Sequence, residues 1–144
     1  MSNFAWTNAH ELGHTEIDGQ HKRMFRLTEA VVESLVENGI NKVEVEVTEL
    51  QTLIDFTGEH FAYEEGLMRA AGYPEEQWHA KYHASLLAEL TNHCGKVQRG
   101  EIANAVGLIS FLWNWLHLHI DSVDRELVVW LSSPRDTSAA GNAT

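Results

Sequence analysis

The chain has 144 residues and a formal net charge of -11, which suits one domain with a single hydrophobic core. An acidic surface repels nucleic acid and anionic membranes, so we expect neither as a partner. The one cysteine, Cys94, excludes an internal disulfide, and the N-terminus shows no basic region followed by an apolar run, as a signal peptide would. We therefore expect a cytoplasmic protein, with a monomer favoured.

Apolar residues recur at helical spacing through most of the chain and predict an all-α protein. The four expected helices cover residues about 19–37, 42–71, 75–99 and 102–131. Short connections between long helices favour an up-down-up-down antiparallel four-helix bundle. We assign residues 1–131 to this bundle, including an ordered N-terminal arm, and expect residues 132–144 to form a disordered tail.

The expected helix boundaries rest on capping residues. Asp18 is the expected N-cap of the first helix, and Asn41 with Glu44 three residues later matches a capping box for the second. Gly72 is expected to end the second helix, and Pro74 suits the first turn of the third. The turn between them folds the second and third helices back against each other.

Two pairs of candidate metal ligands flank this turn, His60 with Glu64 and His79 with His83. Residues four apart lie on one face of a helix, so each pair can direct two donor atoms at one point. Because the two helices are antiparallel, both pairs can face the same point inside the bundle.

Polar residues of this kind stand on the apolar stripe of every expected helix. Buried histidines and carboxylates are costly unless they are paired or bound to a metal. At a helical rise of about 1.5 Å per residue, those of the last three helices lie roughly 8–18 Å from the bundle end that holds the turn, and the arm can set His21 to the same depth. The residues expected in this one layer are His21, His60, Glu64, His79, His83, His119 and Asp124.

The donors in this layer predict two metal ions and one vacancy. Five imidazoles supply five nitrogens, and two carboxylates that each bridge two metals supply four oxygens. A shared oxo or hydroxo group fills two more places, so about eleven of the twelve places around two octahedral ions are taken. Imidazole and carboxylate donors without thiolate suit iron and disfavour a structural zinc site.

These residues resemble the pattern of the hemerythrin family, and more closely that of its single-domain bacterial members. The family pattern is a lone histidine, then HxxxE, HxxxH and HxxxxD, and it is matched here in order over roughly residues 4–131. The flanking EEGLM and GYP sequences also look familial. The resemblance implies a four-helix bundle around a non-haem di-iron centre that binds molecular oxygen reversibly.

The resemblance also implies a role for each ligand. Three histidines would hold a six-coordinate iron, two would hold the iron with the open place, and two carboxylates would bridge. The three are His79, His83 and His119, the two are His21 and His60, and the bridges are Glu64 and Asp124. We expect Leu116, one turn before His119, to line an apolar oxygen pocket.

Two other metal patterns in the sequence fit less well. The segment HELGH, from His10 to His14, matches the HExxH of zinc proteases, but Gly13 weakens the helix that this pattern needs. Two ExxH matches, at 11–14 and 76–79, are typical of ferritin-like di-iron carboxylate proteins. Those proteins also need two further inward-facing glutamates, and we favour chance occurrence.

One departure from the family pattern concerns the residues before the last ligand histidine. Leu118 stands where the family often has asparagine, and His117 is next to it. For His117 we favour packing at a helix interface or exposure to water over a role as a proton donor to the site.

Different functional classes could use the same centre. Oxygen binding, as a carrier, store or delivery protein, is one; a di-iron enzyme that reduces peroxide or nitric oxide is another. An oxygen or redox sensor is a third, and it usually needs an attached signalling domain. We favour oxygen binding and expect no enzymatic activity, because no acid or base beyond the bridge converges on the open iron.

Overall fold

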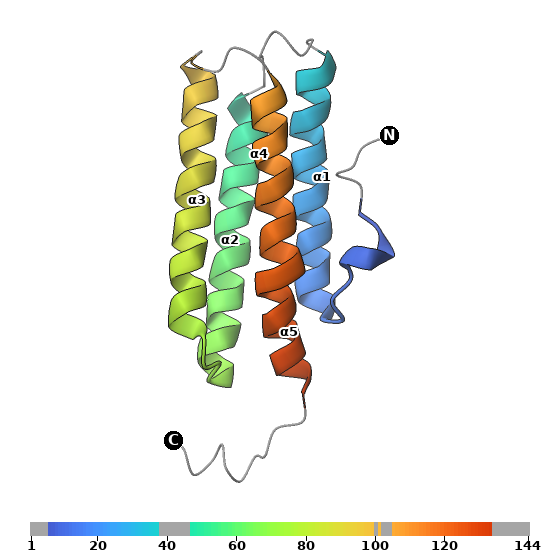
Figure 1. Ribbon diagram of the computed structural model, residues 1–144, viewed down its shortest axis with the longest axis vertical. Coiled ribbons are helices and arrows are strands. Elements are labelled where there is room, and N and C mark those ends of the chain that lie inside the picture. Colours follow the sequence, from blue (N-terminus) through green and yellow to red (C-terminus); the bar gives the residue numbers. More distant parts are fainter. Residues whose placement is uncertain (1–5, 38–46, 100, 102–104, 134–144) are drawn as a thin grey trace.

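The computed structural model describes residues 6–37, 47–99, 101 and 105–133. Its helices form four antiparallel rods that lie side by side, and α4, η2 and α5 together make the fourth rod (Figure 1). The elements are η1 (Asn8–His10), α1 (Thr15–Glu37), α2 (Val47–Ala71), α3 (Glu76–Gln98), α4 (Ala105–Leu118), η2 (His119–Asp124) and α5 (Arg125–Ser132). The predicted all-α four-helix bundle is confirmed.

The core is divided into two apolar clusters by a polar layer. The larger cluster includes Met24, Phe61, Leu86 and Ile120, one from each rod. The smaller cluster lies nearer the end of the bundle that holds the α2–α3 turn, and its buried members are Ile17, Met68, Tyr73, Leu127 and Val128. On α1, α2 and the fourth rod the polar candidates fall between residues of the two clusters, and Tyr73 of the α2–α3 turn belongs to the smaller cluster, so apolar side chains cover the layer on both sides.

The turn between α2 and α3 has the expected glycine stop. Gly72 has a φ of 68°, in the left-handed region that glycine adopts at little cost. Its N–H donates to the carbonyl of Arg69, and the N–H of Tyr73 donates to the carbonyl of Met68 at 3.0 Å, which is the Schellman arrangement. Pro74 stands in the turn, two residues before α3 begins, and not in the first turn of the helix as predicted.

The predicted start of the first helix is wrong by about one turn. Helix α1 begins at Thr15, and the ring Nδ1 of His14 accepts the N–H of Ile17, so His14 is the cap. Asp18 lies inside the helix, where its two carboxylate oxygens accept the N–H groups of Leu12 and Gly13 at 2.9 and 3.0 Å. Asp18 therefore fastens the N-terminal arm to α1 and does not cap the helix.

The fourth rod contains a feature that the sequence did not predict. Residues His119–Asp124 form a π-helical stretch, whose hydrogen bonds join residues five apart. In an α-helix of 3.6 residues per turn, two positions five apart point about 140° away from each other. The wider π turn brings His119 and Asp124 to one face, which explains why the last ligand pair is spaced HxxxxD while the others are spaced by four.

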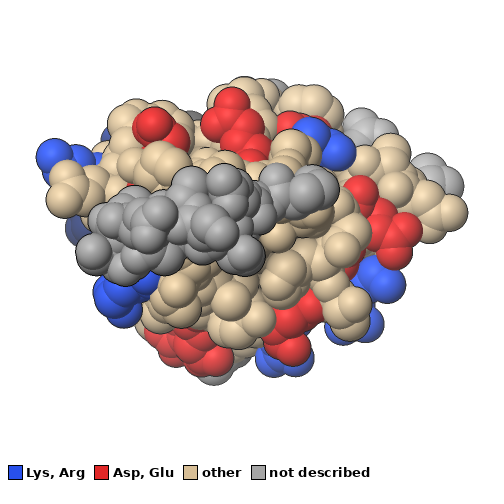
Figure 2. Space-filling model, turned by 90° about the horizontal axis from the view of Figure 1, so that it is seen from below, with Lys and Arg blue, Asp and Glu red and all other residues tan. Residues whose placement is uncertain are grey.

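Some predicted features lie outside the described residues. These are the capping box of Asn41 and Glu44, and all of the expected tail after Ser133. Among the described helices, none is long and apolar enough to cross a membrane. On the end of the bundle seen in Figure 2, acidic and basic side chains are interspersed, without a continuous basic patch among the described residues.

Candidate metal centre

All seven candidate ligands meet in the polar layer, and each has at most 1% of its surface exposed. Every rod contributes: α1 one, α2 two, α3 two, and η2 the last two. The residues are His21 on α1, His60 and Glu64 on α2, His79 and His83 on α3, and His119 and Asp124 on η2. The five imidazoles all direct Nε2 towards the two carboxylates.

The carboxylate of Glu64 spans two groups of histidines. Its Oε1 lies 3.1 Å from Nε2 of His83 and 3.5 Å from Nε2 of His79. Its Oε2 lies 3.1 Å from Nε2 of His60 and 3.8 Å from Nε2 of His21. One oxygen therefore faces each group, as a carboxylate that bridges two cations requires.

Asp124 is arranged in the same way from the opposite rod. Its Oδ1 lies 3.2 Å from Nε2 of His79. Its Oδ2 lies 2.7 Å from Nε2 of His21, 3.3 Å from that of His60 and 3.0 Å from that of His119. The two carboxylates together define two adjacent positions, each surrounded by imidazole nitrogens and carboxylate oxygens.

The described residues form two sets of donor atoms, and within each set all the atoms lie within 4.8 Å of one another. One set comes from His21, His60, His119 and Asp124. The other comes from Glu64, His79, His83 and Asp124, so Asp124 belongs to both. The geometry thus groups His119 with the histidines of α1 and α2. The family resemblance assigns His119 to the histidines of α3 instead, and that assignment stays a prediction.

Several buried polar atoms of the layer fit a cation better than a hydrogen bond. Nε2 of His119 and Oε2 of Glu64 are fully buried and make no hydrogen bond of acceptable angle, although each lies about 3 Å from a group of opposite character. Buried polar atoms are normally satisfied. An imidazole nitrogen and a carboxylate oxygen can each donate a lone pair to a cation, so the donor set fits a pair of metal ions bound by nitrogen and oxygen.

Without a bound metal, the histidines and carboxylates of the layer shift one another's pKa values. Burial alone would lower the pKa of His60, but the Glu64 and Asp124 carboxylates raise that pKa to about 10. Burial likewise opposes protonation of His79, and bonds to the same carboxylates raise the pKa of His79 to about 9. Burial and Asp124 disfavour the Glu64 anion, yet His60 and His79 lower the pKa of Glu64 to about 2. Burial lowers the pKa of His119.

Two outer partners of the histidines were missed from the sequence. Nδ1 of His60 donates to Oε1 of Gln20 at 2.7 Å, and Nδ1 of His83 donates to Oε2 of Glu65 at 2.9 Å. Both partners stand beside a ligand in the chain, but each serves a histidine on a neighbouring helix. No spacing rule within one helix could identify them.

The histidines of the HELGH arm do not join the centre. Gly13 has a φ of 97°, so no helix runs from His10 to His14. The His10 ring packs on Phe25 at 4.5 Å and lies 5.4 Å from the His117 ring. His117 also stacks on Trp113 of its own helix at 4.2 Å and lies 5.6 Å from the ring of Phe25 on α1, which agrees with packing at a helix interface.

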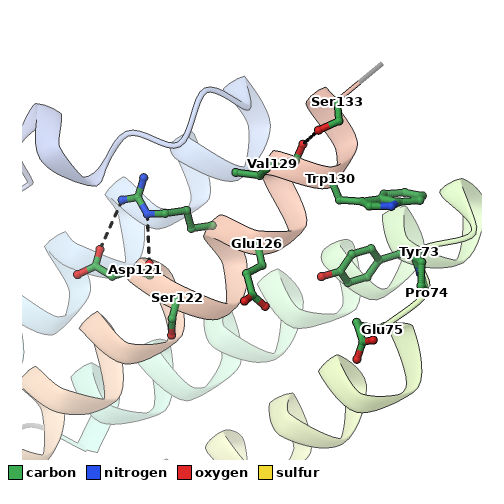
Figure 3. Close-up of a pocket in the computed structure, with 10 residues that line it drawn as sticks. Tyr73, Pro74, Glu75, Asp121, Ser122, Glu126, Val129, Trp130 and Ser133 are labelled. Atoms are coloured by element: carbon green, nitrogen blue, oxygen red, sulfur yellow. Dashed lines mark hydrogen bonds and ion pairs between the residues drawn. The ribbon is translucent and has the colours of Figure 1, made fainter. Parts of the chain in front are cut away.

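A surface hollow of about 700 Å³ lies near the centre but is separate from it. Figure 3 shows Tyr73 below Trp130, with the hydroxyl directed towards the side of Glu126. The ring of Tyr73 is buried and lies 6.3 Å from the ring of His79. Tyr73 therefore stands between the hollow and the ligands.

Comparison with known proteins agrees with this arrangement. Residues 12–131 match the family model described as "Hemerythrin HHE cation binding domain". The chain belongs to the hemerythrin family. A bacteriohemerythrin from Pseudomonas aeruginosa (strain LESB58) is 31% identical over 127 residues, covering 86% of this chain and 78% of that protein. The hemerythrin resemblance inferred from the sequence is therefore confirmed.

More distant hemerythrins match over a similar length. A bacteriohemerythrin from Ralstonia nicotianae is 28% identical over 127 residues, covering 88% of each chain. A hemerythrin chain from Sipunculus nudus is 27% identical over 121 residues, covering 84% of this chain and 87% of that protein. Together with the buried donor set, the family places a metal-binding site in this layer, and the cluster of histidines and carboxylates fits two metal ions.

Proposed function

We propose that this hemerythrin binds molecular oxygen reversibly at a non-haem di-iron centre with an oxo or hydroxo bridge. The observation that carries the proposal is the bridging geometry of Glu64 and Asp124, each with one oxygen towards each group of histidines. Five imidazoles, four carboxylate oxygens and one shared bridge leave about one place in two octahedra for a small ligand. A bound iron pair would supply the electrons and the vacancy that hold dioxygen.

The protein's contribution is to fix the donors and exclude water. Helices from all four rods hold the ligands in place, and the layer is closed on both sides by buried apolar residues. The rings of Phe61 and Trp115 lie 5.2 and 5.9 Å from the ring of His119. Dry, apolar surroundings slow the loss of charged oxygen species and so protect the iron from autoxidation.

Leu116 is our candidate for the wall of the oxygen pocket. It is 0% exposed, belongs to the larger apolar cluster, and stands about one turn before His119 on the fourth rod. A branched apolar side chain at this place occupies volume that water would otherwise enter. We propose this role for Leu116 together with the neighbouring rings of the cluster.

A spectroscopic experiment tests the function. Iron content is first measured on protein from its native source, where two ions per chain are expected. The protein is then reduced anaerobically and exposed to air while the visible spectrum is recorded. A coloured adduct that disappears under vacuum and returns with oxygen supports reversible binding.

The same experiment distinguishes an enzyme from a carrier. Rapid irreversible oxidation, with turnover of added peroxide or nitric oxide, would favour a di-iron reductase and would overturn the proposal. We propose the non-enzymatic reading because the side chain that hydrogen-bonds to the outer nitrogen of His60, on the side assigned to the open iron, is the neutral amide of Gln20, and the ring of Phe61 lies 5.8 Å from the His60 ring.

A further inference from the structure

The two outer hydrogen bonds of the ligand histidines differ in charge. On one side the neutral amide of Gln20 accepts the Nδ1–H of His60, and on the other the carboxylate of Glu65 accepts the Nδ1–H of His83. Amide and carboxylate oxygens are acceptors only, so in both cases Nδ1 carries a proton, and Nε2 is the ring nitrogen that can bind a metal ion once its own proton is displaced. The outer nitrogens of His21 and His119 are buried and have no hydrogen-bond partner in the described residues.

The His83 ring is held from two directions. Phe61 stacks on it with 3.9 Å between ring centroids and 6° between ring planes. The Glu65 carboxylate holds the edge of the ring at 2.9 Å. The stacked ring restrains tilt while the carboxylate fixes rotation, so Nε2 of His83 is directed at Oε1 of Glu64.

A surface hollow of about 220 Å³ lies over this outer edge. It is lined by small residues of α2 and α3, among them Gly58, Ala62, Ala80 and Ala84. Glu65 and His83 also line it, and the Glu65 side chain is 31% exposed. The Glu65 side chain thus extends from solvent to the buried His83. Larger side chains at the four small positions would cover the hydrogen bond between Glu65 and His83.

We propose that Glu65 is the positioning residue of His83. The histidine at the other metal position, His60, has the neutral Gln20 as its outer partner, so the charge of Glu65 makes the two metal positions electronically unequal. A carboxylate that accepts the outer N–H makes the imidazole a more basic ligand. Charge-assisted hydrogen bonds are roughly twice as strong as neutral ones. The ion held by His83 should therefore favour the higher oxidation state more than it would with a neutral partner. This inference rests on the proposed di-iron centre.

Matched variants of the iron-loaded protein separate orientation from charge. Glu65→Ala removes both, and iron loss to a chelator should be on the order of 10–100-fold faster than from the wild type. Glu65→Gln keeps an acceptor oxygen and removes the charge, so the midpoint potential should rise while the iron is largely retained. A tenfold change in the preference for the ferric ion corresponds to about 59 mV for a one-electron couple. Gln20→Glu should shift the potential in the opposite direction.

Glu59→Gln is the control, since it removes one exposed carboxylate from the same helix. Its potential and rate of iron loss should equal those of the wild type. The inference is overturned if Glu65→Ala loses iron at the wild-type rate, if Glu65→Gln leaves the potential unchanged, or if Glu59→Gln shifts it equally. Wild-type protein that holds no iron would instead contradict the proposed function, so the two failures are distinguishable.

Discussion

Oδ2 of Asp124 lies 2.7 Å from Nε2 of His21, although 103 positions of the chain separate the two residues. Both are 0% exposed. This contact joins the first rod to the last, and through Oδ1 the same carboxylate reaches His79 on the third. Asp124 is thus the residue that connects most of the bundle at the level of the polar layer.

Replacing Asp124 by alanine should remove the metal pair and destabilise the fold. Four histidines lose the carboxylate that faces them, and removing one partner of a buried ion pair costs about 3–5 kcal/mol. Metal analysis should give fewer than two ions per chain, and urea denaturation should show the lower free energy of unfolding. Asp121→Ala, whose side chain is 46% exposed, should change neither quantity. Two retained ions in Asp124→Ala would contradict the assignment of this ligand.

Deleting Ser122 should convert the π stretch to ordinary α-helix and leave the metal centre intact. A π turn holds about one residue more than an α turn, so removing one residue while the stretch relaxes keeps α5 in register with α4. His119 and Asp124 are then four apart, the spacing at which His60 and Glu64 share one helix face. Ser122→Ala, which removes only the hydrogen bond from its hydroxyl to the carbonyl of Leu118, is the control and should keep both ions. Metal content and far-UV circular dichroism check the prediction; loss of the ions from the deletion variant but not from Ser122→Ala would contradict it.

Leu116→Ala should speed autoxidation of the oxygenated protein, because the space that it leaves admits water beside the centre. Truncating a buried leucine also costs about 2–5 kcal/mol, so stability has to be separated from the effect on iron. Leu112→Ala is the matched control, since Leu112 is also 0% exposed and lies one turn farther from His119 on the same helix. We expect both variants to lose similar stability, and only Leu116→Ala to bleach faster in air. Equal bleaching rates would count against the pocket role.

Metal uptake should be strongly pH-dependent. In the metal-free protein the pKa of His60 is raised to about 10 and that of His79 to about 9, so both are protonated at neutral pH. A metal ion displaces these protons, and its apparent affinity should rise about tenfold per pH unit for each proton displaced. Titration with Fe²⁺ in weak anaerobic buffer should release protons between pH 7 and 9. Uptake without proton release would contradict the prediction.

The stability of the metal-free protein should also depend on pH through the buried ligands, and above neutral pH it should fall as the pH rises, whereas metal affinity should increase. The pKa of His60 is raised from its ordinary value of 6.5 to about 10, so its contribution is fully present below pH 6.5 and is lost as the pH rises through 10. The pKa of Glu64 is lowered from 4.5 to about 2, so its contribution is present above pH 4.5 and is lost as the pH falls through 2. Both contributions are fully present between pH 4.5 and pH 6.5, so thermal unfolding of chelator-treated protein should show its highest midpoint in this range.

Asp18→Ala should release the N-terminal arm without removing the metals. The variant loses two hydrogen bonds to the N–H groups of Leu12 and Gly13, each worth on the order of 1.5–3 kcal/mol for a charged acceptor. Hydrogen exchange at these two amides should accelerate, while metal content stays at the wild-type level. Glu16→Ala, an exposed acid in the same first turn, is the control. Unchanged protection of the two amides would show that other contacts hold the arm.

The ligand layer could be predicted because its signal is strong on each helix separately. Pairs such as His60 with Glu64 interrupt an apolar stripe at helical spacing, and burial of such groups demands a partner or a metal. The structure brings together all of the side chains that this reasoning selected. The Gly72 stop was predictable for a similar reason, since a positive φ at a helix end selects glycine.

Other features depend on differences too small for a sequence pattern. The π stretch has six residues, about one more than an α-helix would need, and this changes the spacing of the apolar residues very little. The sequence pattern therefore predicts ordinary α-helix from His119 to Asp124. Aspartate is a common N-cap residue, but in this structure His14 caps α1 and Asp18 accepts hydrogen bonds from the N-terminal arm. The contact of Glu65 with His83 depends on the register of α2 against α3, which spacing within one helix does not determine.

Distribution of the donors over all four rods has a consequence for biosynthesis. A nascent chain that has emerged only as far as residue 118 has the helices of its first three rods but neither His119 nor Asp124. Such a chain lacks one of the two carboxylates that face both groups of histidines. Stable insertion of the metal ions should therefore wait until the last rod has been synthesised and can pack over them.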